Sequence, residues 1–496
     1  MIFELVENLQ PTTVLGFLVV LCLSFLYLRR NEKLPPGPRG LPLIGSIPFI
    51  GKNLAAEALQ ISKEYNSDVI TIRLGPILGI FLNSYDTIKD GLSSDDFTDR
   101  PDQIFFKKFI CEGKGIVSTD GPEWKEQRRF ALSVLRDFGM GKMAAEEKIL
   151  NETQQLLTEI EKKGSEEFDI QPLLATSAAN IICLIIFGQR YSYDDEEFSY
   201  YISRFQENVK LMGQGNPLTV IHWLRHLPGD LFHYKQVMRN VRHVLGFLDN
   251  HIKEHKERFD PDNIMDFLDA YILEKQRQDK RNPDNSFTDL QLVNVMGDLF
   301  LAGSDTSATT ILWGLLYLIT MPEIQKKVQQ EIDDVIGRER TPSMMDKRHL
   351  PYTEATILEI HRVGSIGPIG APHSNNARDV MFRGYKIPKG SFVFPNLWAV
   401  HRDPASWKYP EGFHPENFLN ENGEVVLPKT WLPFSSGRRQ CPGESLAKME
   451  VFLVMTSLLQ KFYFSIPEGD EKPALEGVFG MNLSPQPFHL CASLRS

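Results

Sequence analysis

The chain has 496 residues, of which 42% are hydrophobic, and it carries a formal net charge of −10 at pH 7. This length supplies enough apolar material for one large core, and the acidic balance, without a basic stripe of interleaved aromatic residues, argues against nucleic-acid binding. The five cysteines are odd in number, widely spaced and never in a CxxC pair, which argues against a disulfide framework or a structural zinc site and fits a reducing compartment.

An uncharged, strongly apolar run occupies residues 12–28 and is followed by Arg29, Arg30 and Lys33. Its length is near the lower limit for a membrane-spanning helix, about 17–25 residues. Because basic flanks stay in the cytosol, we expect a single-pass anchor with a luminal N-terminus. A cleaved signal peptide is the alternative, but acidic residues precede the run and no small-residue cleavage site follows it.

A stretch rich in proline and glycine comes next, at residues 34–51. These residue types interrupt helices, so the stretch predicts an extended spacer. We therefore divide the chain into an N-terminus with its anchor at 1–30, a hinge at 31–51 and one globular body at 52–496. Strand-like segments at 69–74, at 78–82 and around 380–394 add a small β-rich portion to a body that is otherwise mainly helical.

Capping signals mark several helix starts in this body. Thr288 and Gln291 have the spacing of a capping box, and they predict a long helix that runs to about residue 318. Thr320 and Glu323 have the same spacing and predict the start of the next helix. Pro351 suits a first helical turn and predicts a further helix start.

The middle of the long helix reads A-G-S-D-T at residues 302–306. A glycine and short polar residues lower helix propensity, and Thr306 can bond the carbonyl one turn back and bend the helix. Taken alone, this segment predicts a kink without chemistry. Asp298, Ala302 and Thr306 are spaced i, i+4 and i+8, and are therefore expected on one helix face.

Residues 434–443 read F-S-S-G-R-R-Q-C-P-G and place Cys441 on a tight turn before a helix that begins at about Pro442. At a helix N-terminus, with Arg438 and Arg439 nearby, the thiolate is favoured by the helix dipole and by charge. Such a cysteine is a reactive nucleophile or a metal ligand. A buried, inert cysteine is the alternative.

This loop fills every fixed position of the pattern F-x-x-G-x-R-x-C-x-G and resembles the heme-binding loop of the heme-thiolate monooxygenases (cytochrome P450). The A-G-x-D-T segment and the E-x-x-R pair at 359–362 occur in the order of that family. The P-P-G-P hinge and the motifs at 135–139 and 484–488 look like the animal microsomal type, family 2 and its relatives. The resemblance implies one mainly α-helical cytochrome P450 domain with a small β-rich portion and a membrane anchor.

The resemblance also implies roles for individual residues. Heme b, iron protoporphyrin IX, would take Cys441 as its axial iron ligand. Thr306 would hydrogen-bond bound dioxygen and Asp305 would relay protons. The other residues implied to contact the heme, several of them at its propionates, are Trp124, Arg128, Ala302, His373, Phe434, Arg439 and Gly443.

Glu359 and Arg362 would form a structural ion pair that ties their helix to the loop before the cysteine. The family usually adds an arginine from a downstream P-E-R-F segment, but this chain has Asn417 there. A neutral amide can hydrogen-bond yet brings no charge, so a three-way ion pair is not expected.

The substrate pocket implied by the resemblance is apolar. Asp298 is included as a roof residue, and the alternative is a carboxylate satisfied by neighbouring backbone. The pocket residues are Phe105, Phe109, Ile110, Asp298, Phe300, Leu301, Ile366, Ile369 and Phe479.

The function implied is that of an NADPH- and O2-dependent oxidoreductase, an unspecific monooxygenase that acts on a steroid, fatty acid or xenobiotic. Its expected partners are the lipid bilayer of the endoplasmic reticulum, NADPH–cytochrome P450 reductase and, as a further electron donor, cytochrome b5, with the catalytic body in the cytosol. A basic patch near the cysteine would steer an acidic donor, and scattered solubilising charge is the alternative. The basic residues concerned are Lys125, Arg129, Arg136, Lys142, Arg438 and Lys448.

Two other functions stay open. One is a heme-thiolate isomerase or dehydratase that acts on a peroxide without a reductase. The intact Asp305 and Thr306 argue against it, because that reaction needs no proton delivery to dioxygen. The other is a non-catalytic protein that binds heme or lipid.

Overall fold

The computed structural model describes residues 15–16, 18–20, 33–51, 53–138, 143–213 and 216–495. Most of the expected anchor at 12–28 therefore lies outside the described residues, and those that are described within it, 15–16 and 18–20, are helical and exposed. Over the described part of the chain, no single helix is both long and apolar enough to cross a bilayer. A bent pair, α11 (Asp289–Thr320) and α12 (Pro322–Val335), meets those criteria of length and composition only when the two are taken together.

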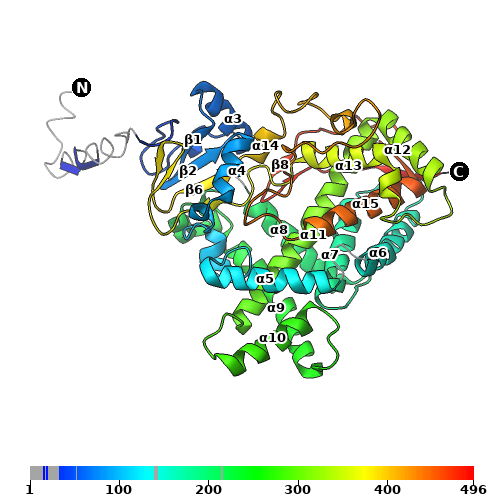
Figure 1. Ribbon diagram of the computed structural model, residues 1–496, viewed down its shortest axis with the longest axis horizontal. Coiled ribbons are helices and arrows are strands. Elements are labelled where there is room, and N and C mark those ends of the chain that lie inside the picture. Colours follow the sequence, from blue (N-terminus) through cyan, green and yellow to red (C-terminus); the bar gives the residue numbers. More distant parts are fainter. Residues whose placement is uncertain are drawn as a thin grey trace.

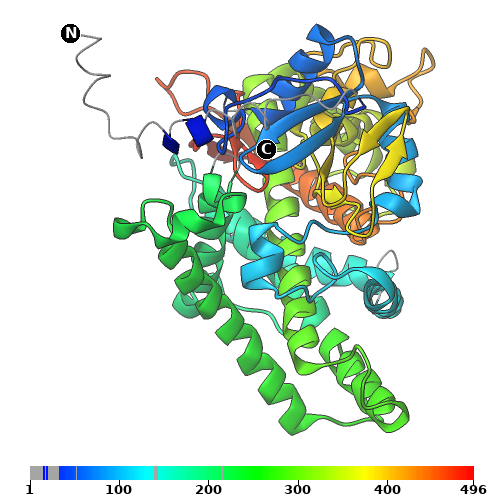
Figure 2. The ribbon, with the colours of Figure 1, turned by 90° about the vertical axis from the view of Figure 1, so that its left-hand side faces the viewer.

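The described part is mainly helical, with its largest sheet at one side (Figure 1). The remaining α-helices are α3 Leu54–Glu64, α4 Tyr85–Ser93, α5 Gly121–Asp137, α6 Met143–Glu161, α7 Gln171–Ile186, α8 Glu196–Leu211, α9 Tyr234–Arg258, α10 Phe267–Arg281, α13 Pro351–Gly364, α14 Leu397–Val400 and α15 Glu444–Lys461. Figure 2 shows α9 and α10 extending away from the sheet beside the lower half of α11.

The largest sheet has the strand order β1-β2-β6-β3, in which only β2 and β6 run parallel. Three two-stranded sheets pair β4 with β5, β7 with β10, and β8 with β9. The strands are β1 Val69–Leu74, β2 Ile77–Leu82, β3 His373–Ser374, β4 Val380–Phe382, β5 Tyr385–Ile387, β6 Phe392–Pro395, β7 Phe462–Ser465, β8 Val478–Phe479, β9 Leu483–Ser484 and β10 Cys491–Leu494.

The strand predictions agree with this arrangement, apart from their boundaries. The predicted strand at 69–74 is β1, and β2 begins one residue earlier than expected, at Ile77. The stretch at 380–394 is not continuous, because Arg383 (φ 49°) and Gly384 (φ 82°) form a turn between β4 and β5. Two successive positive φ values are typical of a type I′ hairpin turn, which matches the twist of the flanking strands.

Helix α11 crosses the middle of the helical portion and anchors the core. Thr288 is its N-cap, as predicted, and its side chain accepts a hydrogen bond from Gln291 N–H at 3.1 Å. The helix ends at Thr320, two residues later than expected. The predicted capping box at Thr320 is wrong, because Met321 is the N-cap of α12 and the Thr320 hydroxyl donates to carbonyls within α11.

Close packing of α11 against α7 passes through the A-G-S-D-T segment. A Cβ added at Gly303 would lie 2.8 Å from Ile182 Cγ1, so the glycine allows the two helices to approach each other. The helix remains continuous there.

Candidate active site

The loop before α15 is shaped around Cys441. Its N–H donates to the Phe434 carbonyl at 3.0 Å, which closes the loop on itself. Gly437 has φ 75°, and a Cβ there would lie 2.1 Å from the Leu92 carbonyl oxygen. Only glycine fits such a backbone and such an approach. Helix α15 begins at Glu444, slightly after the predicted start at Pro442.

The Cys441 side chain is exposed, although most of its surroundings are protein. Burial raises the pKa of this thiol above its ordinary value. The backbone N–H groups of Gly443 and Glu444 and the guanidinium of Arg128 act in the opposite direction. The helix start therefore favours the thiolate, but the free-energy cost of desolvating the thiolate is larger than this stabilisation.

The two arginines beside Cys441 do not provide the expected stabilisation of its thiolate. Arg438 is paired with Asp95 at 3.1 Å, and Arg439 with Asp120 at 3.0 Å. Arg128 is the cation that lowers the Cys441 pKa. Chain proximity was misleading here because a side chain of seven heavy atoms can turn towards a distant partner.

The middle of α11 presents a second accessible surface. Ala302 is exposed although most of the helix around it is buried. The Thr306 hydroxyl donates to the Ala302 carbonyl at 2.6 Å, as expected for a threonine within a helix. Ala302 and Thr306 lie on one face of α11, and this accessible face therefore presents a small side chain and a hydroxyl.

Asp305 points to a different partner from Thr306, since neighbouring helical residues do not face each other. Its carboxylate accepts a hydrogen bond from Asn482 Nδ2 at 2.6 Å, in the turn between β8 and β9. Burial raises the pKa of Asp305, while Asn482 and Lys210 oppose that rise. The two residues implied as a proton relay are adjacent in sequence, and a water would have to connect their side chains.

Sequence reasoning missed a buried acid next to this segment. Glu450 of α15 is almost fully buried and accepts a hydrogen bond from Ser307 Oγ at 2.8 Å. Its other oxygen, Oε1, has no partner among the described residues. Burial raises the pKa of Glu450 to about 8. A single acid in the otherwise apolar α15 stretch was the available signal.

A cluster of cations lies between the Cys441 loop and α5. The Arg439 guanidinium stacks on the Trp124 ring, 4.1 Å from its centroid, and Arg128 donates to the Gln440 carbonyl. The Trp124 Nε1 is buried with no hydrogen-bond partner in the described ranges. A buried N–H without an acceptor is costly, and here it lies beside two guanidinium groups.

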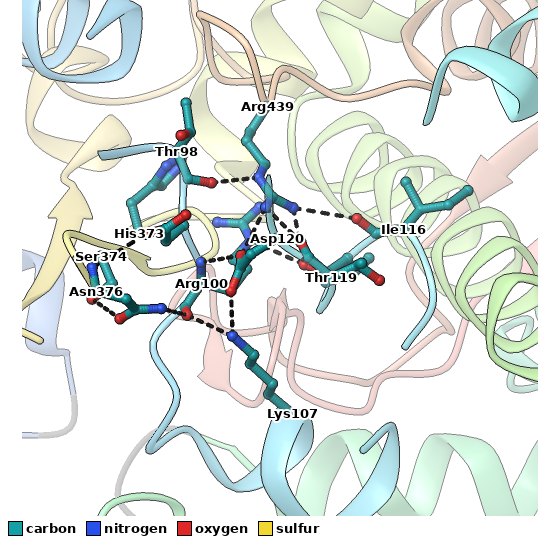
Figure 3. Close-up of polar contacts among 12 residues, drawn as sticks. Thr98, Arg100, Lys107, Ile116, Thr119, Asp120, His373, Ser374, Asn376 and Arg439 are labelled. Carbon is teal, nitrogen blue, oxygen red and sulfur yellow. Dashed lines mark hydrogen bonds and ion pairs between the residues drawn. The ribbon is translucent and has the colours of Figure 1, made fainter. Parts of the chain in front are cut away.

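The cluster continues through Arg439 and Arg100 towards β3 (Figure 3). Arg439 donates to the carbonyls of Thr98 at 2.7 Å and Thr119 at 2.6 Å, and burial lowers its pKa to about 9. Arg100, which sequence reasoning missed, donates to the Pro372 carbonyl at 2.8 Å, and burial lowers its pKa to about 10.

His373 lies beside these arginines in β3. Its Nδ1 is 2.7 Å from the Phe97 carbonyl and must donate to it, so the neutral ring presents Nε2 as an acceptor. Burial and the positive charges of Arg100 and Arg439 lower the pKa of His373. It could donate to a carboxylate only after gaining a second proton.

These features fit the heme implied by the sequence. A planar group with two carboxylates needs an axial sulfur, an unobstructed opposite face and cationic donors at its edge. Cys441 and Ala302 are both exposed, while Arg100, Arg128 and Arg439 gather beside the Trp124 N–H. The acceptor that the indole N–H lacks is a group that a propionate supplies.

Glu359 and Arg362 form a fully buried, bidentate ion pair with distances of 2.6 and 2.7 Å. Arg362 also donates to four backbone carbonyls between residues 401 and 412. The pair thus ties α13 to the segment that leads towards the Cys441 loop.

Asn417 occupies the place where the family usually has an arginine. Its Nδ2 donates to Glu359 Oε1 at 3.2 Å and to the Tyr409 carbonyl at 2.9 Å. The ion pair therefore has two charged members and a neutral third, as the substitution suggested.

The Asp298 carboxylate accepts hydrogen bonds from backbone N–H groups, in agreement with the alternative interpretation of this residue. Its Oδ2 accepts from Ile116 N–H at 2.6 Å and Val117 N–H at 2.8 Å. Burial raises its pKa to about 7, against these two hydrogen bonds and Arg100. It fixes the chain before α5 to α11.

The apolar residues predicted for a pocket fall in separate clusters. Phe105, Phe109 and Ile110 pack with residues of α9. Phe300, Ile366 and Phe479 belong to the main core, Ile369 packs beneath the largest sheet and Leu301 is half-buried. Phe105 and Phe300 are almost fully buried, so their rings serve packing in this conformation.

A hollow of about 520 Å³ lies on the surface beside α5 and the Cys441 loop. Much of the predicted basic patch lines it, while Lys142 lies outside the described residues and Lys448 is paired with Glu444 at 2.6 Å. The lining residues are Trp124, Lys125, Arg128, Arg129, Leu132, Ser133, Arg136 and Arg438. A hollow of about 590 Å³ between α3 and α14 contains none of the predicted site residues.

Comparison with known proteins gives matches over nearly the whole chain. The family model described as Cytochrome P450 matches residues 35–492. Human Cytochrome P450 2U1 is 36% identical over 509 residues, which cover 97% of this chain and 93% of the human protein. Human Cytochrome P450 2D6 is 37% identical over 498 residues, covering 98% and 99%, and Drosophila melanogaster Cytochrome P450 18a1 is 35% identical over 477 residues, covering 94% and 88%.

Proposed function

Because the chain belongs to the cytochrome P450 family of heme-thiolate monooxygenases, we propose that it transfers one oxygen atom of O2 to a lipophilic substrate. The electrons come from NADPH through cytochrome P450 reductase. The observation that carries the proposal is the exposure of Cys441 and Ala302 together with the buried cation cluster at Trp124.

Cys441 would provide the sulfur ligand of the heme iron, and the loop residues Phe434 and Gly443 would shape its surroundings. Arg128, Arg439 and the Trp124 N–H would hold the propionates, with Arg100 as an additional cation and His373 once it is protonated. When bound, heme b supplies the activation of O2 and the insertion of oxygen into the substrate, and the thiolate favours O–O cleavage.

The chain's own residues manage protons on the α11 side. The Thr306 hydroxyl donates to the Ala302 carbonyl. Its oxygen can accept a hydrogen bond from a water, and the hydroxyl can donate its proton to a substrate-side acceptor when it turns away from that carbonyl. Asp305, whose pKa is raised by burial, holds a proton more readily near neutral pH than an exposed aspartate does. We assign Asp305 as the acid that resupplies Thr306 through water.

The electron donor docks on the basic hollow beside α5. Lys125, Arg129, Arg136 and Arg438 line this hollow, and such a surface attracts an acidic protein. Cytochrome P450 reductase is the donor that we assign, with cytochrome b5 as a second occupant of the same face.

An apolar side of the molecule supports a membrane location. Leu43 and Phe49 in the hinge, and Trp223 and Leu231 between α8 and α9, are all largely exposed. The two segments approach each other at Gly75, which is close to both Ile221 and the Leu43 carbonyl. We assign this side to the cytosolic face of the endoplasmic reticulum bilayer, with residues 1–30 as the anchor, 31–51 as the hinge and 52–496 as the catalytic body.

The decisive experiment is product mass after incubation of the membrane-bound protein with reductase, NADPH and pooled steroids, fatty acids and drug-like compounds. A product heavier by one oxygen, dependent on NADPH and O2, is expected. Cys441→Ala should lose both product and the thiolate-type carbon monoxide spectrum, and Thr306→Ala should keep heme but lower product per NADPH consumed. Peroxide turnover without reductase would instead favour the isomerase, and no turnover of any substrate would favour a binding protein.

A further inference from the structure

Asp120 occupies the N-cap position of α5, but among the described residues its carboxylate makes no capping bond to that helix. Its Oδ1 accepts from Arg439 Nη2 at 3.0 Å and from the Arg100 N–H at 2.7 Å. Its Oδ2 accepts from Lys107 (Figure 3). An aspartate at this position usually satisfies its own helix, so Asp120 has been diverted to distant partners.

Lys107 lies in a short π-helix, η3 (Phe106–Ile110), between two rings of the predicted pocket. Phe105 and Phe109 flank it, with ring centroids 5.2 Å apart, and pack towards α9. The Lys107 side chain is only 12% exposed, and its amine also donates to the Arg100 carbonyl at 3.0 Å. Lys107 is therefore close in the chain to the predicted pocket residue Phe109, while its amine contacts Asp120 and Arg100 of the cation cluster.

The backbone of η3 and of the residues after it is irregular. π-helical turns are uncommon and occur mostly at functional sites. Immediately after η3, Glu112, Gly113 and Gly115 all have positive φ values, of 50°, 73° and 91°. The backbone bonds of this segment are those of turns, such as Gly113 N–H to the Lys107 carbonyl at 3.0 Å and Lys114 N–H to the Cys111 carbonyl at 2.8 Å. The ion pair of Lys107 adds a side-chain contact to these bonds.

Asp120 also balances charge for Arg439. Arg439 stacks on Trp124 and is flanked by Arg100 and Arg128, whose positive charges lower its pKa. Removing the Asp120 charge would leave these guanidinium groups facing one another with less compensation. The Asp120 carboxylate thus contacts both Arg439, which is assigned to the heme, and Lys107 of η3, the helix that we call the pocket roof.

We propose that Asp120 and Lys107 are positioning residues that couple the pocket roof to the hold on the heme. Asp120 orients Arg439 for a propionate, and Lys107 ties η3 to that orientation. This inference rests on the proposed function, in that it requires heme to occupy the site beside Cys441.

Lys107→Met removes the ion pair that ties η3 to Asp120. Lys108→Met is the matched control, because Lys108 is adjacent but its amine contacts Gln103 and the Phe109 ring rather than Asp120. We expect hydrogen exchange at residues 104–115 to accelerate about fivefold in Lys107→Met, the effect of one ion pair. Binding of 1-phenylimidazole to the ferric holoprotein should quicken by a similar factor. Lys108→Met should match the wild type in both, and Lys107→Arg should restore wild-type rates.

Asp120→Asn should change the roof in the same direction but less than Lys107→Met does, because Lys107 keeps its pair with Asp102. It should also speed heme transfer to apomyoglobin, which Lys107→Met should leave near the wild-type rate. Combining the two substitutions should change the phenylimidazole rate by less than the sum of the single effects, because both remove the Lys107–Asp120 pair, while Lys107→Met also removes the pair of Lys107 with Asp102 at 2.8 Å. Equal exchange in Lys107→Met and Lys108→Met, or an unchanged heme-loss rate in Asp120→Asn, would overturn the inference. Neither readout depends on turnover, so a protein without NADPH-dependent product would refute the proposed function separately.

Discussion

The two sides of the site are built in different ways. The base of the site consists of the ion pair of Glu359 and Arg362, the loop 434–443 and α15. The roof of the site consists of the helix η3 and residues 216–233. Charge and backbone hydrogen bonds hold the base, where Arg362 alone makes contacts with Glu359 and four carbonyls. Ring contacts hold much of the roof, such as Phe109 to His222 at 5.1 Å, and Lys107 adds its ion pair with Asp120.

This difference indicates which side of the site tolerates substitution of its side chains. Buried charges require particular partners, and losing one leaves the other uncompensated. Apolar contacts are less specific, since rings of similar volume can repack. The base therefore fixes one geometry at the sulfur, whereas the roof can vary with the substrate.

The largest expected effect is at the base. Arg362→Met should destabilise the protein by about 3–5 kcal/mol, because Glu359 would remain buried without its cation. Denaturant unfolding and the yield of heme-bound protein measure this loss. Adding Glu359→Gln to Arg362→Met should recover part of the stability, and a single variant as stable as the wild type would contradict the role of the base.

Glu450→Gln should stabilise the base in a pH-dependent way. Burial raises the folded-state pKa of Glu450 from 4.5 to about 8, so between these values the native state holds a proton that the unfolded state has released. Wild-type stability therefore falls as pH rises through this window. Since glutamine does not titrate, the advantage of the variant should grow by roughly 3 kcal/mol from pH 5 to pH 8.

Unfolding free energies at pH 5, 6.5 and 8 test this expectation. Glu444→Gln, in the first turn of the same helix, is the control, because Glu444 is partly exposed and paired with Lys448. A difference between Glu450→Gln and the wild type that stayed constant with pH would mean that Glu450 is not a protonated buried acid.

Asn417→Ala should have a smaller effect on the base. The amide accepts from Tyr409 N–H and donates to the Tyr409 carbonyl and to the Glu359 carboxylate. Loss of these bonds, one of them to a charged group, costs about 1–3 kcal/mol. Chemical denaturation beside Asn422→Ala, an exposed residue of the same region, measures it. A loss as large as that of Arg362→Met would show that the third position is as important as the ion pair.

The smallest effect on stability is expected in the roof. Phe109→Leu should cost less than about 1.5 kcal/mol, because Phe109 is only partly buried and leucine retains most of the apolar contact. The affinity for lipophilic ligands should change more than the unfolding free energy does. Ligand titration beside denaturation measures both, and a collapse of stability would erase the contrast between roof and base.

The sequence by itself determined the features that depend on neighbouring residues. The Cys441 loop, the start of α11 after Thr288, the start of α13 at Pro351 and the strand β1 were all predicted. Capping, turn geometry and side-chain alternation act over a few residues, so their signals are contiguous in the chain. The capping box at Thr320 failed because α11 continues through Thr320, whose hydroxyl donates to carbonyls of that helix, and α12 begins only after Met321.

Only the tertiary structure decided which distant groups meet. Arg439 reaches Asp120, Glu450 reaches Ser307 and Arg100 reaches the Pro372 carbonyl, and none of these pairs leaves a spacing pattern in the sequence. Packing of the sheet and helices brings them together, and burial then sets their pKa values. Long-range partners depend on the geometry of the whole fold, which local residue patterns do not encode.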